Sequence, residues 1–326
     1  MDKMTSDSAS CGDFRFVRYD ASRRREWDEF TRNSANATFL FMRGYMDYHS
    51  DRFRDCSLMA YYKGKLRACL PANIEEEGTL VSHGGLTYGG WIFPRAHFDG
   101  NKVQELFEAW IPWCRTEGLR QIVYKPVPWV LSPMPAQEDL YALWRLGFTL
   151  RSRLLSSAIF PDNNPGFNMA KRQQLRDASR REDLRAGESS DWHAFHAMLC
   201  DCLASRHDAA PVHTLPELEL LHSRFPKNIR LFAVTDTDGA MLAGAVIFDT
   251  GFTAHTQYMA TSPRGRELNA LTLLVHTLVC DIFPTRRVFD FGTSNLPDKS
   301  LHASLLEQKY SLGGRGAVYE TYTLTL

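Results

Sequence analysis

The sequence predicts a protein of mixed α/β (α+β) class, with two tandem domains that each have a mixed central sheet flanked by helices. Two observations carry this prediction. The order helices, strand meander, helix, strand, helix, strand occurs twice along the 326 residues, and such repetition is typical of duplicated units. The stretch "YSLGGRGAVYETYTL" (310–324) also echoes "FTLRSRLLSSAI" (148–159). We therefore expect domains at 13–160 and 161–326, after a disordered N-terminus at 1–12.

In the first half, "FRFVRYD" (14–20) alternates apolar and polar residues as a strand does. The next strands are expected to form a hairpin that turns at Lys63-Gly64. Val103, Leu106, Phe107 and Trp110 share one face of an amphipathic helix. The other elements expected in this half are helices at 22–34, 42–53 and 138–148 and strands at 121–125 and 153–160.

In the second half, a three-strand meander over 229–261 includes Asp238-Gly239, a strong hairpin signal. A long amphipathic helix is expected at 267–283, and "RVFDFG" (287–292) has the pattern of a buried strand. The other expected elements are helices at 190–205, 215–224 and 300–310 and a final strand at 314–324.

The glycines of "GGRG" (313–316) suggest a phosphate-binding loop at first sight. Such a loop needs a strand before it and a helix after it, so that helix amides point at the anion. Here the order is reversed, with a helix before and a strand after. We expect the glycines to cap that helix in a left-handed conformation.

Composition limits the classes of function. The 38 basic and 38 acidic residues cancel, which does not indicate a DNA-binding or membrane-surface protein. The seven cysteines are odd in number and lack a paired spacing, as expected in a reducing compartment. Residues 1–12 lack the apolar stretch of a signal peptide, and 268–283 is too short to span a bilayer. These features predict a cytoplasmic protein without a transmembrane segment.

The chain resembles the acyl-CoA N-acyltransferase (GNAT) superfamily in its tandem form, as found in Fem-type peptidyltransferases and Fem-like acetyltransferases. The resemblance covers about 13–326. It rests on the following stretches: "TFLFMRGYMDYHSDRF", "MAYYKGKLRACLPANI" and "HGGLTYGG" in the first half, and "AKRQQLRDASRRE", "AGAVIFDTGFTAHTQYMATS", "VFDFGTSN" and "LLEQKYSLGGR" in the second.

In this superfamily a V-shaped splay between two central strands admits the pantetheine arm of acyl-CoA, and the helix start after the meander binds the pyrophosphate. The resemblance places that site in the second half, at "TSPRGRELNALTLLV", where helix amides and guanidinium groups suit a diphosphate. Only one glycine of the family pattern is present, and an exposed polar loop is the alternative. The cofactor-binding residues expected for acetyl-CoA or another acyl-CoA are Arg264, Gly265, Arg266, Leu268, Asn269, Ser294 and Asn295.

Acyl transfer to an amine requires removal of a proton from the amine and return of a proton to the leaving thiolate. Many members of the superfamily use a tyrosine on the late helix as the acid. This chain has Trp144 and Leu306 at the two corresponding positions, and neither can donate a proton. Asp290, at the end of a buried strand, is the candidate catalytic base; its alternative role is to cap the following turn.

The resemblance and the strand pattern suggest a set of substrate-binding residues, and each has a structural alternative such as a tight turn, a core aromatic or a solvated lysine. The candidates are His83, Tyr88, Tyr258 and Lys309. No metal is expected. His193, His196 and Cys200 share a helical face, but no HExxH or CxxC spacing accompanies them.

The first hypothesis for function is an N-acyltransferase that uses acyl-CoA, most simply acetyl-CoA, to modify an amine of a small molecule or of a cell-envelope or polysaccharide precursor. The second is aminoacyl transfer from tRNA, as in Fem-type enzymes. A tRNA partner is disfavoured because the chain lacks a long helical hairpin with a heptad pattern. The third is a catalytically degenerate tandem protein that only binds a ligand or partner. The acceptor and the oligomeric state are left open.

Overall fold

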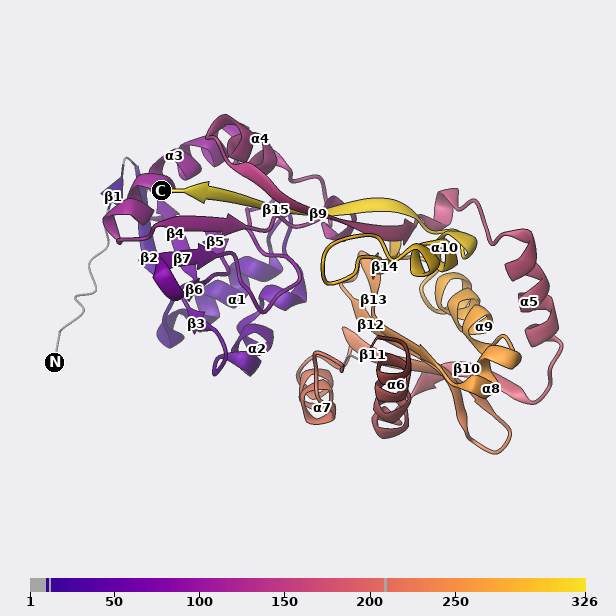
Figure 1. Ribbon diagram of the computed structural model, residues 1–326. Coiled ribbons are helices and arrows are strands. Elements are labelled where there is room, and N and C mark those ends of the chain that lie inside the picture. Colours follow the sequence, from indigo (N-terminus) through magenta and orange to yellow (C-terminus); the bar gives the residue numbers. More distant parts are fainter. Residues whose placement is uncertain (1–9, 12, 208–209) are drawn as a thin grey trace. The chain divides into compact units, whose positions relative to one another are not determined.

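The computed structural model describes residues 10–11, 13–207 and 210–326, which pack into two compact units (Figure 1). The first unit extends to Arg153 and also contains Val318–Leu326, whereas the second is Leu154–Ala317. The domains predicted at 13–160 and 161–326 were defined by the repeated order of elements and not by packing. Their boundary stays a prediction. Within the expected disordered segment, Ser10–Cys11 form a short strand; residues 1–9 and 12 lie outside the described residues.

The first unit contains two sheets. Its smaller sheet has the strand order β1-β2-β4-β5, and its part of the larger sheet has the order β15-β8-β7-β6-β3. In this part β7 and β8 run parallel, whereas β15 and β8, β7 and β6, and β6 and β3 pair antiparallel, so the larger sheet is mixed, as predicted. The strands are β1 Ser10–Cys11, β2 Phe14–Arg18, β3 Arg54–Asp55, β4 Leu58–Tyr62, β5 Lys65–Leu70, β6 Asn73–Glu75, β7 Thr79–Val81 and β8 Gln121–Tyr124, with parts of β9 Thr149–Ile159 and β15 Arg315–Thr325.

The predicted hairpin between β4 and β5 is confirmed. Lys63 and Gly64 have φ values of 49° and 78°, as the two central residues of a type I′ turn require. The helices of this unit are α1 Arg24–Arg32, α2 Arg43–Met46, α3 Gly100–Thr116 and α4 Glu138–Arg145. The apolar face predicted for α3 is buried in the aromatic-rich core. The helix expected at 42–53 is shorter than predicted, because α2 passes into a 3₁₀ turn at Asp47–His49.

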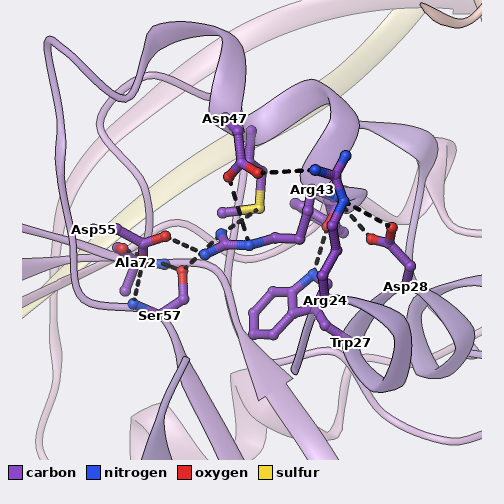
Figure 2. Close-up of polar contacts among 10 residues, drawn as sticks. Arg24, Trp27, Asp28, Arg43, Asp47, Asp55, Ser57 and Ala72 are labelled. Carbon is purple, nitrogen blue, oxygen red and sulfur yellow. Dashed lines mark hydrogen bonds and ion pairs between the residues drawn. The ribbon is translucent and has the colours of Figure 1, made fainter. Parts of the chain in front are cut away.

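A fully buried arginine, Arg43, joins α2 to the strands of the first unit (Figure 2). Its guanidinium contacts the carboxylates of Asp55 and Asp47. The guanidinium carbon also lies 3.4 Å from the ring centroid of Tyr19 and 5.0 Å from that of Trp27. Ion pairing and cation–π contact together replace the water that burial removes from this charge.

The second unit is built around a sheet with the order β10-β11-β12-β13-β14-β9. Every adjacent pair is antiparallel except β13 and β14, which run parallel. Gly239 adopts a φ of 83° in the turn between β11 and β12, which confirms the predicted hairpin. The strands, besides β9, are β10 Leu184–Ser189, β11 Ile229–Asp236, β12 Met241–Asp249, β13 Thr253–Thr261 and β14 Val288–Thr293.

The long helix expected at 267–283 is broken near its start. Asn269 has a φ of 58°, a left-handed conformation that asparagine tolerates better than most residues, and it separates two helices. Gly313 has a φ of 92° just after α10, so "GGRG" ends a helix, as predicted. The helices are α5 Met169–Ser179, α6 Trp192–His207, α7 Leu215–Arg224, α8 Pro263–Glu267, α9 Ala270–Thr277 and α10 Ala303–Ser311, with a π turn at Leu278–Ile282. Across the described part of the chain, no helix combines the length and apolarity needed to cross a membrane.

Candidate functional site

The parallel strands β13 and β14 pair over only a short distance. Their register extends from Thr253 opposite Val288 to His255 opposite Asp290. β13 then continues to Thr261, but within the described residues the pairing with β14 goes no further. The two central strands of the second unit therefore separate after His255, as the resemblance implied.

A polar cavity of about 280 Å³ lies at the far end of β13. Its walls come from α5, the end of β13, α8, α9 and α10, all in the second unit. Two of the lining side chains are cationic and none is a carboxylate, so the cavity suits an anion. The lining residues are Lys171, Gln174, Thr261, Gly265, Arg266, Asn269, Leu271, Thr272 and Gln308.

The helices α5 and α9 pack side by side (Figure 1) and bring a lysine to this cavity. Lys171 Nζ donates a hydrogen bond of 2.9 Å to Gln174 Oε1, which also accepts a bond of 3.0 Å from Thr272 Oγ1. Partial burial lowers the pKa of Lys171. A bound anion would favour the charged form of this amine. In the sequence, Lys171 lies in the stretch "AKRQQLRDASRRE", which supports the family resemblance but was not linked to the cofactor residues.

The start of α8 is held tightly against β12. Ser262 Oγ accepts a hydrogen bond of 3.0 Å from the Gly265 amide, a helix N-cap. A Cβ atom on Gly265 would lie 1.9 Å from the carbonyl oxygen of Leu242, so only glycine fits there. Arg266 Nη1 donates to the carbonyl of Thr261 at 3.0 Å, which anchors its guanidinium at the cavity wall.

Of the predicted cofactor residues, Gly265, Arg266 and Asn269 line the cavity, whereas Arg264 and Leu268 do not. Arg264 is exposed and pairs with Glu267 at 3.0 Å. Leu268 packs in the apolar core of the second unit. The prediction that these residues bind a cofactor stays a prediction.

Ser294 and Asn295 bind the segment after β14 to β9 instead of lining the cavity. The Ser294 amide donates to the Leu155 carbonyl at 2.8 Å. Asn295 Oδ1 accepts from the Leu155 amide, and its Nδ2 donates to the Lys299 carbonyl, each at 2.8 Å. These contacts give both residues a structural role, and their predicted cofactor role stays a prediction.

Asp290 is fully buried and accepts several hydrogen bonds. Its Oδ2 lies 2.6 Å from His255 Nδ1, and its Oδ1 accepts a bond of 2.7 Å from Ser156 Oγ. The Gly292 amide also donates to Oδ2 at 3.2 Å. The predicted role of Asp290 as base stays a prediction, but its contacts favour a carboxylate that holds an imidazole. The sequence pattern did not single out His255, because its link to Asp290 depends on the register of two distant strands.

Lys309 lies on α10 and is 3% exposed. Its Nζ donates to the carbonyls of Gly292 and Thr293 at 2.8 and 2.7 Å, and burial lowers its pKa to about 8. Tyr258, on β13, has its hydroxyl 2.7 Å from His213 Nδ1, and burial raises its pKa. Both residues were expected to bind substrate, and that role stays a prediction.

The other two substrate candidates lie in the first unit. His83 has a φ of 55°, stacks on His49 at 5.1 Å, and its Nδ1 is buried without a hydrogen-bond partner. Burial lowers the pKa of His83 to about 3. The Tyr88 hydroxyl lies 2.9 Å from Thr38 Oγ1 within the core. Their predicted substrate role is not tested by these contacts.

His196, on α6, has polar contacts within the second unit. His196 Nε2 lies 3.2 Å from the carbonyl of His213, and its Nδ1 lies 3.6 Å from Cys200 Sγ. Among the described residues, no group of three or more His, Cys, Asp or Glu side chains could hold a metal ion.

Comparison with known proteins agrees with this geometry. Residues 169–300 match the family model described as "Acetyltransferase (GNAT) domain". The structure of FemX matches with a TM-score of 0.68 at 14% identity, covering 95% of this chain and 97% of FemX. A tandem GNAT protein from the clavulanic acid biosynthesis pathway matches with a TM-score of 0.53 at 12% identity, covering 96% and 98%.

A conserved protein of unknown function from Bacteroides thetaiotaomicron also matches, with a TM-score of 0.60 at 11% identity over 95% of this chain and 99% of that one. A search of curated proteins found no match. The predicted fold is thus confirmed: a mixed α/β structure that corresponds over nearly its full length to FemX and to tandem GNAT proteins. The stretch that matches the GNAT acetyltransferase domain model, residues 169–300, includes the separating strands and much of the cavity.

Proposed function

We propose that the protein is an N-acyltransferase that moves an acyl group, most simply acetyl, from acyl-CoA to an amine of a small molecule or of a cell-envelope or polysaccharide precursor. The observation that carries this proposal is the cationic, carboxylate-free cavity at the far end of β13, beyond the point where β13 and β14 separate. The GNAT domain at 169–300 supports the reaction class.

The residues around the cavity fit the phosphates of an acyl-CoA. Lys171 and Arg266 supply two positive charges, and Gly265 lets the start of α8 pack closely against β12 beside the cavity. Arginine and lysine are both common phosphate ligands, and arginine adds directional hydrogen bonds. At about 280 Å³ the cavity is too small for a whole acyl-CoA. We therefore assign the cavity to the phosphates, and the space between the separated strands to the pantetheine arm.

The proposal is tested by titrating the full-length protein with acetyl-CoA and CoA by calorimetry. The variant Lys171→Glu/Arg266→Glu reverses both cavity charges and should weaken binding at least 100-fold. Arg264→Glu is the matched control, because Arg264 also lies on α8 but is exposed and paired with Glu267 outside the cavity. This control should bind within about threefold of wild type.

Equal losses in the double variant and the control would contradict the cavity assignment. No binding of either ligand to the wild type would contradict the acyl-CoA donor and redirect the search to an aminoacyl-tRNA donor. One observation favours a binding-only protein as second candidate: Leu306, on α10, replaces the tyrosine acid expected there. Tight binding of acetyl-CoA with no release of thiol in the presence of any amine would support that candidate.

A further inference from the structure

Acyl transfer needs a group that handles two protons, and this inference rests on the function proposed above. One proton leaves the attacking amine, and one must reach the departing thiolate. Leu306 on α10 cannot supply the second. The second unit therefore needs another titratable side chain beside the separated strands.

His255 occupies that place. It forms the last pair between β13 and β14, so its side chain stands where the two strands begin to separate. Its side chain is 14% exposed, whereas that of its partner Asp290 is fully buried. The bond from Nδ1 to Asp290 fixes the ring and turns Nε2, on the opposite edge, away from the carboxylate.

The structure also makes room for the imidazole on the far strand. Gly292 follows Asp290 by two residues and has a φ of 73°. A Cβ atom at this position would lie 3.3 Å from His255 Cε1, which is tighter than most such contacts. The Cε1 atom of the ring, which lies between the two nitrogens, is therefore next to a glycine of β14.

We propose that His255 is the catalytic proton carrier of this unit and that Asp290 is its positioning residue. His255 Nε2 accepts the proton that the amine loses as its nitrogen bonds to the acyl carbon. The C–S bond then breaks with its electron pair on sulfur, and Nε2 returns the same proton to the thiolate. The products are the amide and the free thiol, and His255 ends neutral, as it began. Asp290 holds Nδ1–H and stabilises the imidazolium between the two transfers.

The two buried residues near His255, Asp290 and Lys309, are less suited than His255 to carry this proton. Both oxygens of Asp290 already accept hydrogen bonds, from Ser156 and from His255 and Gly292, and its carboxylate has no exposed surface. Lys309 Nζ donates to two β14 carbonyls and its side chain is buried, so its amine is already engaged in structural contacts. Of these three residues, His255 is the one that combines an anchored ring with a partly exposed side chain.

The position of His255 also selects the kind of donor. Six residues of β13, about 20 Å at the usual rise per residue, separate it from Thr261 at the cavity wall. A nucleotide confined to the cavity would not reach it. A donor with a long arm, such as an acyl-pantetheine thioester, would extend along the separated strands to Nε2.

The first test reads the ring directly by nitrogen NMR of full-length protein labelled at histidine. His255 is assigned from the resonance lost in His255→Gln. We expect the Nδ1–H tautomer in the wild type, a mixture of tautomers in Asp290→Asn, and a shift of Nε2 when CoA is added. His222 is the internal control, because its Nδ1 bonds a carbonyl of β11 at 2.7 Å and no carboxylate; its resonances should not move.

The second test measures thiol release from acetyl-CoA with ethanolamine, glycinamide and glucosamine as amine probes. For each probe that the wild type uses, His255→Gln should lower kcat by about 10² to 10³, with unchanged affinity for acetyl-CoA by calorimetry. Asp290→Asn should lower kcat with KM retained, and His222→Gln should leave both unchanged.

The outcomes separate this inference from the function on which it rests. If wild-type protein binds CoA but the Nε2 resonance stays in place, or if His255→Gln retains full kcat, His255 is not the proton carrier while the acyl-CoA proposal stands. If wild-type protein binds no CoA, the proposed function fails and the inference falls with it.

Discussion

Replacing Arg43 by methionine tests how the first unit is held together. Methionine nearly matches the length of arginine, so the variant removes the charge and the planar guanidinium without leaving a large cavity. Asp55 loses its cationic partner, whereas Asp47 keeps a contact of 3.8 Å with Arg24 (Figure 2). Both carboxylates are 37% exposed, and water can therefore hydrate them again in the variant.

The expected loss of stability follows from these contacts. Breaking a fully buried ion pair costs about 3–5 kcal/mol, but the exposure of the two carboxylates reduces that contribution to about 1–2 kcal/mol. The contacts with Tyr19 and Trp27 are worth about 1 kcal/mol each for a desolvated cation. We expect Arg43→Met to lower the free energy of unfolding by about 3 kcal/mol.

Urea unfolding followed by tryptophan fluorescence measures this change, because Trp27 lies beside the guanidinium. The chain has two compact units, so each transition is fitted separately. The control is Arg43→Lys, which keeps the charge but loses the planar stacking surface. It should lower the free energy of unfolding by about 1–2 kcal/mol, less than Arg43→Met, because an ion pair with Asp55 can remain. A loss below about 0.5 kcal/mol in Arg43→Lys would refute the reasoning, since charge alone would then explain the site.

Three further predictions concern other buried positions. The pKa of His83 is about 3 in the folded protein and about 6.5 in the unfolded chain, so between these pH values the unfolded chain binds one more proton. Burial of neutral His83 therefore lowers the free energy of unfolding by about 2 kcal/mol at pH 5 and has almost no effect above pH 6.5. The urea midpoints at pH 7 and pH 5 should differ less in His83→Gln than in wild type. Gly292→Ala should lower stability more than Gly251→Ala, because both glycines have positive φ but only the new methyl group at Gly292 meets His255. Equal thermal midpoints of the two variants would contradict the close contact between Gly292 and the His255 ring. Gly265→Ala should weaken acetyl-CoA binding in calorimetry, because the new Cβ would collide with a carbonyl of β12 and displace α8. If the variant binds acetyl-CoA as tightly as wild type, the start of α8 is not part of the site.

Local chemistry made the turns predictable from the sequence. Lys63-Gly64, Asp238-Gly239 and Gly313 all adopt the conformations expected of them, because a glycine in a left-handed position depends on its immediate neighbours. The break at Asn269 was missed, since the surrounding residues have good helix periodicity and an asparagine within them gives only a weak signal.

The site was only partly predictable because its contacts join distant segments. Gly265 and Arg266 were expected near a cofactor and do line the cavity, but Lys171 reaches the same cavity through the packing of α5 on α9. His255 meets Asp290 through the register of two parallel strands. Arg43 carries no mark in the sequence that separates a buried arginine from a surface one.

The last strand, β15, has a consequence for the order in which the protein is made. Residues 318–326 belong to the first unit, and Tyr322 pairs with Tyr124 of β8, although the ribosome produces these two residues far apart in time. The second unit is one continuous stretch, Leu154–Ala317, and all of it exists before the first unit has its final strand. Domains usually fold from the N-terminus onward during synthesis. In this chain the half that is made first is the half whose sheet is completed last.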